Sequence, residues 1–178
     1  MRKITAGLFV SLDGVVEAPE TWHFPYFDDE MGQAVGRQME AADGMLLGRR
    51  TYEEFAAHWP HQDPEKNPLA ESMNARAKYV VSTTLTAPAW QNTQVVTLAG
   101  LAALKEQPGR NLSVVGSATL VVSLLREGLL DELELLVHPI VVGSGKRLFD
   151  DARGQIPLQL TSSVTFGTGV LNLIYKRA

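Results

Sequence analysis

Along most of this chain, short apolar runs rich in β-branched residues alternate with longer segments of helical period. Such runs predict strands, and the segments between them predict helices. The strand candidates of this region are residues 3–11, 44–48, 78–82, 94–97 and 112–116. The helix candidates are residues 28–42, 51–58 and 117–128. Strands that alternate with helices favour a largely parallel sheet with helices on its faces, so the chain is predicted to be an α/β protein.

The last third of the chain differs, because its strand patterns have no helix between them. Residues 132–142 alternate and then become continuously apolar, and residues 158–165 and 170–176 flank the turn sequence Gly167-Thr168-Gly169. The final pair predicts a hairpin, and hence an antiparallel edge on the parallel sheet. The whole pattern predicts a three-layer mixed sheet of about eight strands with flanking helices.

The size of the chain is consistent with one domain, because 178 residues can enclose a single core and neither a repeat nor a long linker divides them. We therefore expect a single domain over residues 1–178. The absence of cysteine excludes disulfides, thiolate metal sites and a cysteine nucleophile. No apolar run reaches the roughly 18 residues of a membrane span. The N-terminal apolar stretch also lacks a small-residue cleavage site, so we expect a cytoplasmic protein without a membrane partner.

Charge excludes one class of partner. The formal net charge is -4 and no run of Lys and Arg is longer than two residues, so a nucleic-acid-binding protein is not expected. An anionic ligand must instead find its cations locally. A metal site is not expected either, because Pro60 interrupts helical geometry between the closely spaced His58 and His61.

Three segments place glycine, hydroxyl or cationic residues directly after a predicted strand. They are LLGRRTYEEF at 46–55, VVGSATL at 114–120 and VVGSGKRLF at 141–149. Backbone N–H groups at a helix start or in a glycine turn attract anions, and arginine adds charge-assisted hydrogen bonds, so each segment is a candidate phosphate site. The alternatives are a capping box formed by Thr51 and Glu54, a plain N-cap at Ser117, and a flexible turn with solvated charges in the third segment.

Aromatic and acidic residues form the other set of candidates. Residues 15–27 contain two prolines and four aromatic residues, which is typical of a long ordered loop with a function. Asp13 precedes this loop, and Asp28 stands at the start of the helix that follows it. A carboxylate can bind the amide and amine edge of a flat heterocycle while aromatic rings stack on its face. A turn aspartate and a set of helix-start charges are the ordinary alternative.

The order of these motifs resembles a known family. A first strand ending in SLDG is followed by the aromatic loop and then by LLGRRTYE, KYVVS, LSVVGSATL and VHPIVVGSGKRLF. In this order, over residues 3–176, the chain resembles proteins of the dihydrofolate-reductase-like fold. It is most similar to the reductase domain of the bifunctional riboflavin-biosynthesis deaminase-reductase and to its stand-alone relatives. No segment resembles the zinc deaminase half of that enzyme.

The resemblance implies an NADPH site across the carboxyl ends of the central strands. On the adenosine side it implies a turn that meets the 2′-phosphate and a second contact, formed by Gly48, Arg49, Thr51, Ser82 and Thr83. At the pyrophosphate it implies Gly116, Ser117, Ala118 and Thr119. At the border of the nicotinamide-side pocket it implies Gly143, Ser144 and Gly145.

On the substrate side, the resemblance implies an aromatic wall and an acid that supplies a proton. The wall residues are Trp22, Phe24, Phe27, Tyr52, Phe55 and Trp59. The catalytic candidates are Asp13, which aligns with the SLDG strand end, and Asp28, near the position of the helix-start carboxylate of dihydrofolate reductases.

The function that the resemblance implies is NADPH-dependent reduction of a planar heterocycle, similar to the reaction of 5-amino-6-(5-phosphoribosylamino)uracil reductase in riboflavin biosynthesis. Dihydrofolate reduction and NADPH binding without turnover are the alternatives. The expected partners are a small heterocyclic substrate and a second copy of the chain. We expect a homodimer because an apolar segment such as 132–142 often buries a sheet edge between two copies.

Overall fold

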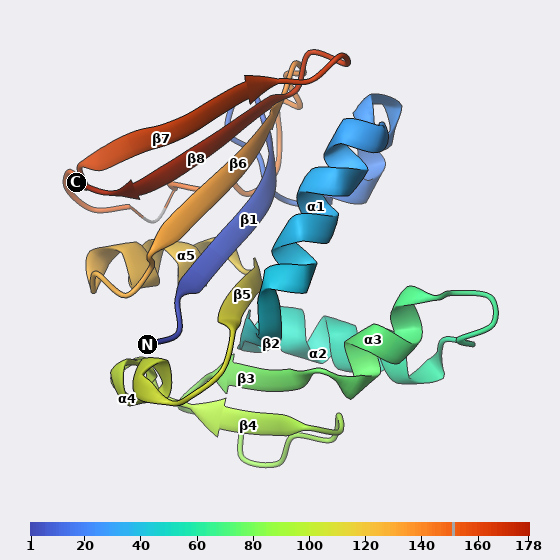
Figure 1. The fold of residues 1–178 in the computed structure, drawn as a ribbon, viewed down its shortest axis with the longest axis vertical. Coiled ribbons are helices and arrows are strands. Elements are labelled where there is room, and N and C mark those ends of the chain that lie inside the picture. Colours follow the sequence, from blue (N-terminus) through green and yellow to red (C-terminus); the bar gives the residue numbers. More distant parts are fainter. Residues whose placement is uncertain (151) are drawn as a thin grey trace.

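A mixed sheet of eight strands forms the centre of the molecule, which a computed structural model describes for residues 1–150 and 152–178 (Figure 1). The strand order is β4-β3-β2-β5-β1-β6-β8-β7. The strands are β1 Ile4–Ser11, β2 Ala42–Gly48, β3 Ala77–Val81, β4 Thr93–Val96, β5 Asn111–Gly116, β6 Glu132–His138, β7 Leu158–Thr165 and β8 Leu171–Arg177. The first six strands of that order are parallel, and β8 is antiparallel to both β6 and β7. The predicted α/β class and the closing hairpin are confirmed.

Helices cover both faces of the sheet and make the predicted three layers. The α-helices are α1 Asp29–Ala41, α2 Arg49–His58, α3 Leu69–Ala75, α4 Leu101–Glu106 and α5 Ala118–Arg126. The short 3₁₀ helices are η1 Pro19–Thr21 and η2 Phe24–Tyr26, both before α1, and η3 Trp59–His61, after α2. In Figure 1, α1 crosses one face of the sheet while α5 lies behind the other.

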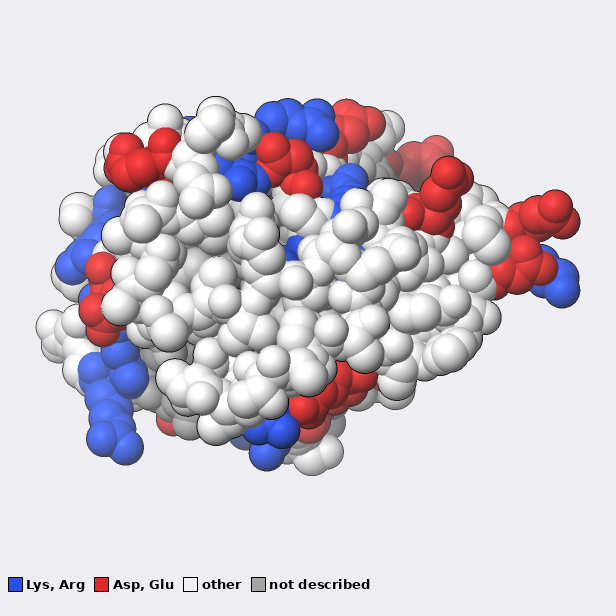
Figure 2. Space-filling view, turned by 90° about the horizontal axis from the view of Figure 1, so that it is seen from below, with Lys and Arg blue, Asp and Glu red and all other residues white. Residues whose placement is uncertain are grey.

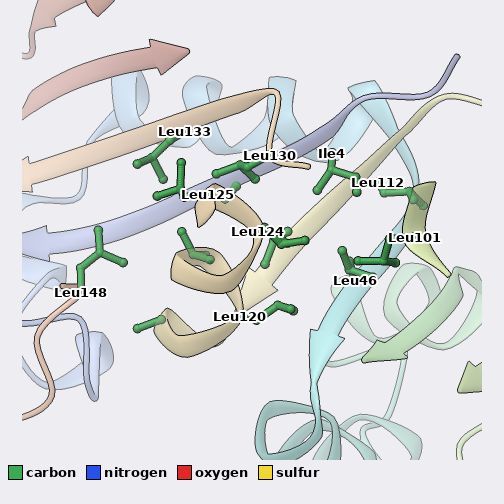
Figure 3. Close-up of a cluster of buried hydrophobic side chains, with 14 of the residues drawn as sticks. Ile4, Leu46, Leu101, Leu112, Leu120, Leu124, Leu125, Leu130, Leu133 and Leu148 are labelled. Carbon is green, nitrogen blue, oxygen red and sulfur yellow. The ribbon is translucent and has the colours of Figure 1, made fainter. Parts of the chain in front are cut away.

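The largest buried cluster lies between the sheet and helices α4 and α5. In Figure 3, Leu124 and Leu125 of α5 point toward the sheet, where Ile4, Leu112 and Leu133 lie. These residues fit the helical and strand periods of the sequence, because they place one apolar face of α5 against one face of the strands. Full burial of each leucine contributes about 1.5–3 kcal/mol, so this layer fixes the position of α5 and of the turn before it.

The opposite face carries two smaller clusters. Side chains alternate along a strand, so Leu46 of β2 joins the cluster under α5 while Met45 and Leu47 point to the other face. There they pack with residues of α2 and α3, namely Tyr52 and Met73, and with Val80 and Trp90. Under α1, the cluster consists of Met31, Ala34, Leu136, Phe166 and Val170.

Two sequence-based predictions of element boundaries are wrong, and two short helices were not expected. Helix α2 begins at Arg49 with Gly48 as its N-cap, so Thr51 does not cap it and no capping box with Glu54 forms. Helices α3 and α4 are each too short to show a helical period in the sequence. Strand β6 ends at His138 and not at residue 142, because Pro139 follows and cannot donate to a ladder.

The position of β6 also changes the expected dimer contact. This strand lies between β1 and β8, so the segment proposed to bury an edge is an interior strand of one chain. The outer strands are β4 and β7. Among the described residues, no helix is both long and apolar enough to cross a membrane.

Candidate functional site

The turns that leave the parallel strands gather at one edge of the sheet. Because parallel strands run in the same direction, their carboxyl ends meet there, and ligands of open α/β sheets bind in the crevice outside these ends. The last residues of the five strands that matter here are Ser11, Gly48, Val81, Gly116 and His138.

The turns after β2 and β5 touch each other. A β-carbon added at Gly48 would lie 2.9 Å from Oγ of Ser117, and one added at Gly116 would lie 3.0 Å from Oγ1 of Thr51. Gly116 also has a φ of +152°, which is unfavourable for a residue with a side chain. The structure therefore brings together four of the predicted cofactor residues, and the close approach explains why two of them are glycines.

The start of α5 lies beside this contact. The Ser117 hydroxyl caps the helix by accepting a hydrogen bond from the Leu120 N–H, as the sequence predicts. Ala118 and Thr119 occupy the first turn, at the positive end of the helix dipole. Lys146 donates from Nζ to Oγ1 of Thr119 over 2.6 Å, which places a cation next to this helix start.

A pocket of about 310 Å³ opens beside the β2 turn, between the ends of β3 and β4. It is lined by Arg49, Val81, Ser82, Thr83, Thr84, Thr97 and Leu98. Arg49 spans it by donating from Nη1 to Oγ1 of Thr84 at 2.6 Å, while its Nε donates to Glu53 of α2 at 2.7 Å. The pocket is at the small end of the range for ligand sites and offers a guanidinium and several hydroxyls, which suits a phosphate on a ribose.

Asp13 holds two loops together at the end of β1. Its carboxylate accepts hydrogen bonds from the Ser11 hydroxyl at 2.6 Å and from the N–H groups of Val142 and Gly143 at 3.0 and 2.9 Å. These bonds, that of Ser11 first, lower the pKa of Asp13 from 3.8 to about 2. An acid that is ionised at neutral pH and already occupied cannot give up a proton, so the geometry does not support the predicted catalytic role of Asp13. It supports a structural one, in which Asp13 positions the loop that contains Gly143 and Gly145.

The second catalytic candidate caps a helix. The Asp28 carboxylate accepts from the Met31 N–H at 2.9 Å and so begins α1, as the sequence predicts. Glu30, in the first turn of the same helix, contacts the β7–β8 turn instead: its carboxylate accepts a hydrogen bond from the Gly167 N–H at 2.7 Å. A proton-transfer role for Asp28 stays a prediction.

Aromatic rings surround a buried histidine at the ends of β1 and β6. His138 is fully buried, and its ring makes edge-on contacts with Phe9, Trp22 and Tyr26 at centroid distances of 5.7, 5.1 and 5.7 Å. His23 stacks on Phe9 at 4.5 Å and lies 6.1 Å from His138. We call these five residues the His138 cluster. It packs the loop after β1 against the sheet.

Both imidazoles of the His138 cluster have a pKa below that of an ordinary histidine. Burial lowers the pKa of His138, and burial together with the neighbouring His138 ring lowers the pKa of His23. Among the described residues, Nε2 of His138 and Nδ1 of His23 have no hydrogen-bond partner. Sequence reasoning missed this pair, although a histidine inside an aromatic loop and one at a strand end before proline were visible signals.

The structure does not assemble the predicted aromatic wall. Trp22 belongs to the His138 cluster, and Phe24 and Phe27 are largely exposed beside it. Tyr52 is a core residue instead, because it is 3% exposed and its hydroxyl accepts from the Trp90 N–H at 3.0 Å. Its place on the inner side of α2 rules it out as an accessible wall residue.

The remaining two wall candidates pack beside Tyr52. The rings of Phe55 and Trp59 meet edge to face at 6.3 Å and lie half-buried against the cluster under α2. The six aromatic residues therefore divide between two separate clusters, and only the group from the loop after β1 lies at the carboxyl end of β1 and β6.

One apolar side chain is exposed in the middle of the sheet. Val115 belongs to β5, which has β2 on one side and β1 on the other, yet it is 39% exposed. Its neighbour Val114 belongs to the cluster under α5, and the register between β2 and β5 shifts at Val115, because Val114 pairs with Leu46 and Gly116 pairs with Leu47. This irregular, exposed position lies directly before the glycine turn at Gly116.

The fold and these strand-end turns define a dihydrofolate-reductase-like protein. The dihydrofolate reductase of Enterococcus faecalis, solved with NADP(H), is similar in structure with a TM-score of 0.64 and 14% identity over 98% of this chain and 96% of that one. A protein of Shewanella sp. PV-4 named for riboflavin biosynthesis matches with a TM-score of 0.76 and 20% identity over 99% of both chains.

The family is narrower than the fold. The chain belongs to the RibD C-terminal domain family, whose model matches residues 2–172. The uncharacterized protein YyaP of Bacillus subtilis (strain 168) is 31% identical, over 98% of this chain and 94% of its own length. The resemblance predicted from the order of the motifs is confirmed, and the family is that of a reductase domain.

Proposed function

We propose that the protein is an NADPH-dependent reductase of a planar heterocycle of the pyrimidine type. The observation that carries the proposal is the contact between two glycine turns, at Gly48 and Gly116, with a cationic pocket on one side and the exposed Val115 on the other. Arg49 of the pocket directly follows Gly48, and Val115 directly precedes Gly116, so the two touching turns link an anion site with an apolar side chain. A dinucleotide cofactor has the matching groups, namely phosphates at one end and a flat reactive ring at the other.

The residues present fit the phosphate groups of such a cofactor. Glycine at 48 and 116 lets the two turns approach each other, where a β-carbon would crowd the neighbouring turn, and Gly116 is partly exposed there. The N–H groups at the start of α5, with Lys146 beside them, suit the pyrophosphate. Arg49, Ser82 and Thr83 share one pocket and suit the adenosine ribose with its 2′-phosphate.

The substrate ring is proposed to lie over Val115, next to the loop that carries Trp22 and Phe27. A bound nicotinamide supplies the hydride, and one proton is consumed for each hydride transferred. Val115 gives the ring an apolar surface, and the loop after β1 limits the access of water from one side. Because Asp13 is occupied as an anion, the proton is assigned to water or to Asp28.

The substrate class follows from the family and not from the site alone. The match to the RibD C-terminal domain favours a pyrimidine related to 5-amino-6-(5-phosphoribosylamino)uracil over dihydrofolate. NADPH binding without turnover is the second candidate. It is favoured by one observation, which is that the carboxylate aligned with the SLDG motif is committed to backbone hydrogen bonds.

Calorimetric titration with NADPH and NADH tests the cofactor assignment. For Arg49→Ala we expect NADPH to bind about 10–100-fold more weakly, because a charge-assisted hydrogen bond contributes about 1.5–3 kcal/mol, while NADH affinity stays unchanged. Arg50→Ala is the matched control, since it removes the adjacent arginine, which does not line the pocket. Failure of the wild-type protein to bind NADPH, or equal losses for both cofactors in Arg49→Ala, would contradict the assignment.

A turnover assay distinguishes a reductase from a protein that binds NADPH without reaction. NADPH oxidation is followed after addition of a ribosylaminopyrimidine and, separately, of dihydrofolate. We expect oxidation with the pyrimidine. Tight NADPH binding with no oxidation on either substrate would instead support the binding protein.

A further inference from the structure

Residues 18–27, in the loop between β1 and α1, contact the sheet through side-chain packing. Within the described part of the chain, every hydrogen bond of this segment ends inside residues 17–27. The indole of Trp22, for example, donates from Nε1 to the Glu17 carbonyl at 3.1 Å. The ring contacts of the His138 cluster therefore hold the segment against the sheet. A segment held in this way can open locally while the rest of the fold stays intact.

The backbone at the base of this segment is strained. Ala18, directly before η1, has a φ of +45°, in the left-handed region that disfavours residues with a β-carbon. Such a conformation persists only where the surrounding contacts over-determine it. The packing of Trp22, His23 and Tyr26 thus keeps the chain in a shape that it does not prefer by itself.

The two imidazoles at the centre of this packing have no place for a second proton. Nδ1 of His138 lies 2.8 Å from the Leu136 carbonyl, which only accepts, so this nitrogen carries the hydrogen of the neutral ring. A further proton must bind at Nε2, which is buried and, among the described residues, has no partner. Nδ1 of His23 is buried and unpartnered in the same way. Either imidazolium would contain a buried N–H without an acceptor, which disfavours the charged ring.

The charged groups around the cluster have other partners. Burial and the neighbouring His138 ring lower the pKa of His23 more than Glu20 of the same loop raises it. The part of β8 beside β6, residues 171–174, carries no charge. Asp29 is exposed at the start of α1. The carboxylates of β6, of α1 and of the turn after β1 accept hydrogen bonds from other groups: Glu134 from Gln38, Asp28 from Met31, Glu30 from Gly167, Asp13 from Ser11 and Glu17 from Lys146.

Cations and more distant charges do not change this balance. Arg147, the cation beside the turn after β1, lies 3.7 Å from the Asp13 carboxylate. The charges on the β4 side gather at the margin of a broad uncharged face (Figure 2), and β3, β2 and β5 separate β4 from β1. Among the described residues, no carboxylate hydrogen bonds to His23 or His138, so an imidazolium in the closed loop has no hydrogen-bonded counter-ion.

We propose that the His138 cluster is an acid-sensitive latch, which holds residues 18–27 on the sheet at neutral pH and releases them when either imidazole is protonated. In the open loop both rings reach water, where an imidazolium finds hydrogen-bond acceptors. The release uncovers Phe9 and the end of β6, at the carboxyl edge of the sheet.

The lowered pKa values set the pH range of the latch. Burial lowers the pKa of both imidazoles below 6.5 in the closed loop, and exposure in the open loop removes this cause. The closed loop is therefore favoured in full above pH 6.5 and loses this advantage as pH falls toward the closed-state pKa values. Each imidazole that is protonated only in the open loop raises the ratio of open to closed loop by up to about 30-fold at about pH 5.

Acrylamide quenching of Trp22 fluorescence tests the latch, because this residue is 6% exposed in the closed loop. Trp22→Phe identifies the part of the signal that comes from the other two tryptophans, Trp59 and Trp90. Between neutral pH and about pH 5, we expect the quenching of Trp22 to increase several-fold while the far-ultraviolet circular dichroism stays unchanged. The measurement needs neither cofactor nor substrate, so its outcome is independent of the proposed reductase activity.

Two variants remove one titrating ring each and keep the cluster apolar, namely His23→Phe and His138→Leu. We expect Trp22 in both variants to become accessible at a lower pH than in the wild type. His61→Gln is the matched control, because this histidine is exposed outside the cluster, and it should behave like the wild type. If His138→Leu fails to fold, His23→Phe decides alone, since it changes only the loop.

Three results would overturn the proposal. The first is quenching of Trp22 that stays constant between neutral pH and about pH 5. The second is quenching that increases in His23→Phe at the same pH as in the wild type. The third is loss of the circular dichroism signal together with the increase in quenching, because the whole fold would then open and not the loop.

Discussion

The two halves of the carboxyl edge are built in opposite ways. Around the ends of β2, β3 and β5, the accessible groups are backbone N–H, hydroxyls and the guanidinium of Arg49. Around the ends of β1 and β6, the rings of the His138 cluster bury one another and two of their nitrogens. One half is suited to anions, while the other excludes water from apolar surface.

The boundary between the two halves is where chemistry is expected. Val115 is exposed at this boundary, between the glycine turn of β5 and the strand β1 that carries Phe9. A cofactor held by its phosphates in the polar half would extend its ring toward the aromatic half. We therefore expect cofactor binding and substrate binding to depend on different residues. A substitution in one half should change one of the two affinities and leave the other unchanged.

The largest effect is expected from Gly116→Val in the polar half. The added side chain would meet Thr51 at 3.0 Å, and the φ of +152° would add about 1–3 kcal/mol of backbone strain. We expect NADPH affinity to fall at least ~10-fold by fluorescence titration. Gly36→Ala in α1 is the control, since its β-carbon would meet nothing within 4 Å, and it should bind NADPH like the wild type. Normal NADPH binding by Gly116→Val would mean that the contact of the two turns is not part of the cofactor site.

A smaller effect should follow from Tyr52→Phe, which tests whether this ring belongs to either half. Removal of the Tyr52 hydroxyl leaves the Trp90 N–H without its acceptor. We expect the free energy of unfolding, measured by denaturant titration, to fall by about 1 kcal/mol. NADPH affinity and turnover should not change. A loss of turnover at unchanged stability would restore Tyr52 to the substrate wall.

The smallest effect concerns the His138 cluster and pH. Because the folded-state pKa values of His23 and His138 lie below their usual value of 6.5, the unfolded chain binds more protons below that pH. Stability from this source is fully present above pH 6.5 and is lost as pH falls toward the folded pKa values. In thermal unfolding between neutral and mildly acidic pH, His23→Phe should show a shallower loss of Tm than the wild type. The exposed His61→Gln serves as the control for histidine removal, and a variant as pH-sensitive as the wild type would contradict the coupling.

Sequence reasoning succeeded where the signal is local. The strands of the parallel sheet, the N-caps at Ser117 and Asp28 and the closing hairpin all follow from spacing within a few residues. The meeting of the Gly48 and Gly116 turns was predicted through the resemblance, since strand order is not encoded in any one segment.

The failures share a physical cause, which is that tertiary contacts decide what a side chain faces. Helix α2 begins at Arg49, three residues earlier than a cap at Thr51 would require, and Tyr52 is held inward by its contact with Trp90. The sequence gives no partner for the carboxylate of Asp13. Only the fold brings the N–H groups of Val142 and Gly143, about 130 residues away along the chain, within hydrogen-bond distance of it. Val115 is exposed at a register shift between β2 and β5, which the sequence of either strand alone does not show.

The central position of β1 has a consequence for the order in which the chain acquires its structure. The first strand pairs only with β5, which begins at Asn111, and with β6, which ends at His138. At a synthesis rate of about 5–20 residues per second, the first strand waits roughly 5–20 s at the ribosome before β5 exists. During that time its apolar residues have no sheet to join, and contacts so distant along the chain are slow to form. The first strand to be made therefore lies in the middle of the finished sheet and depends on partners that are made more than 100 residues later.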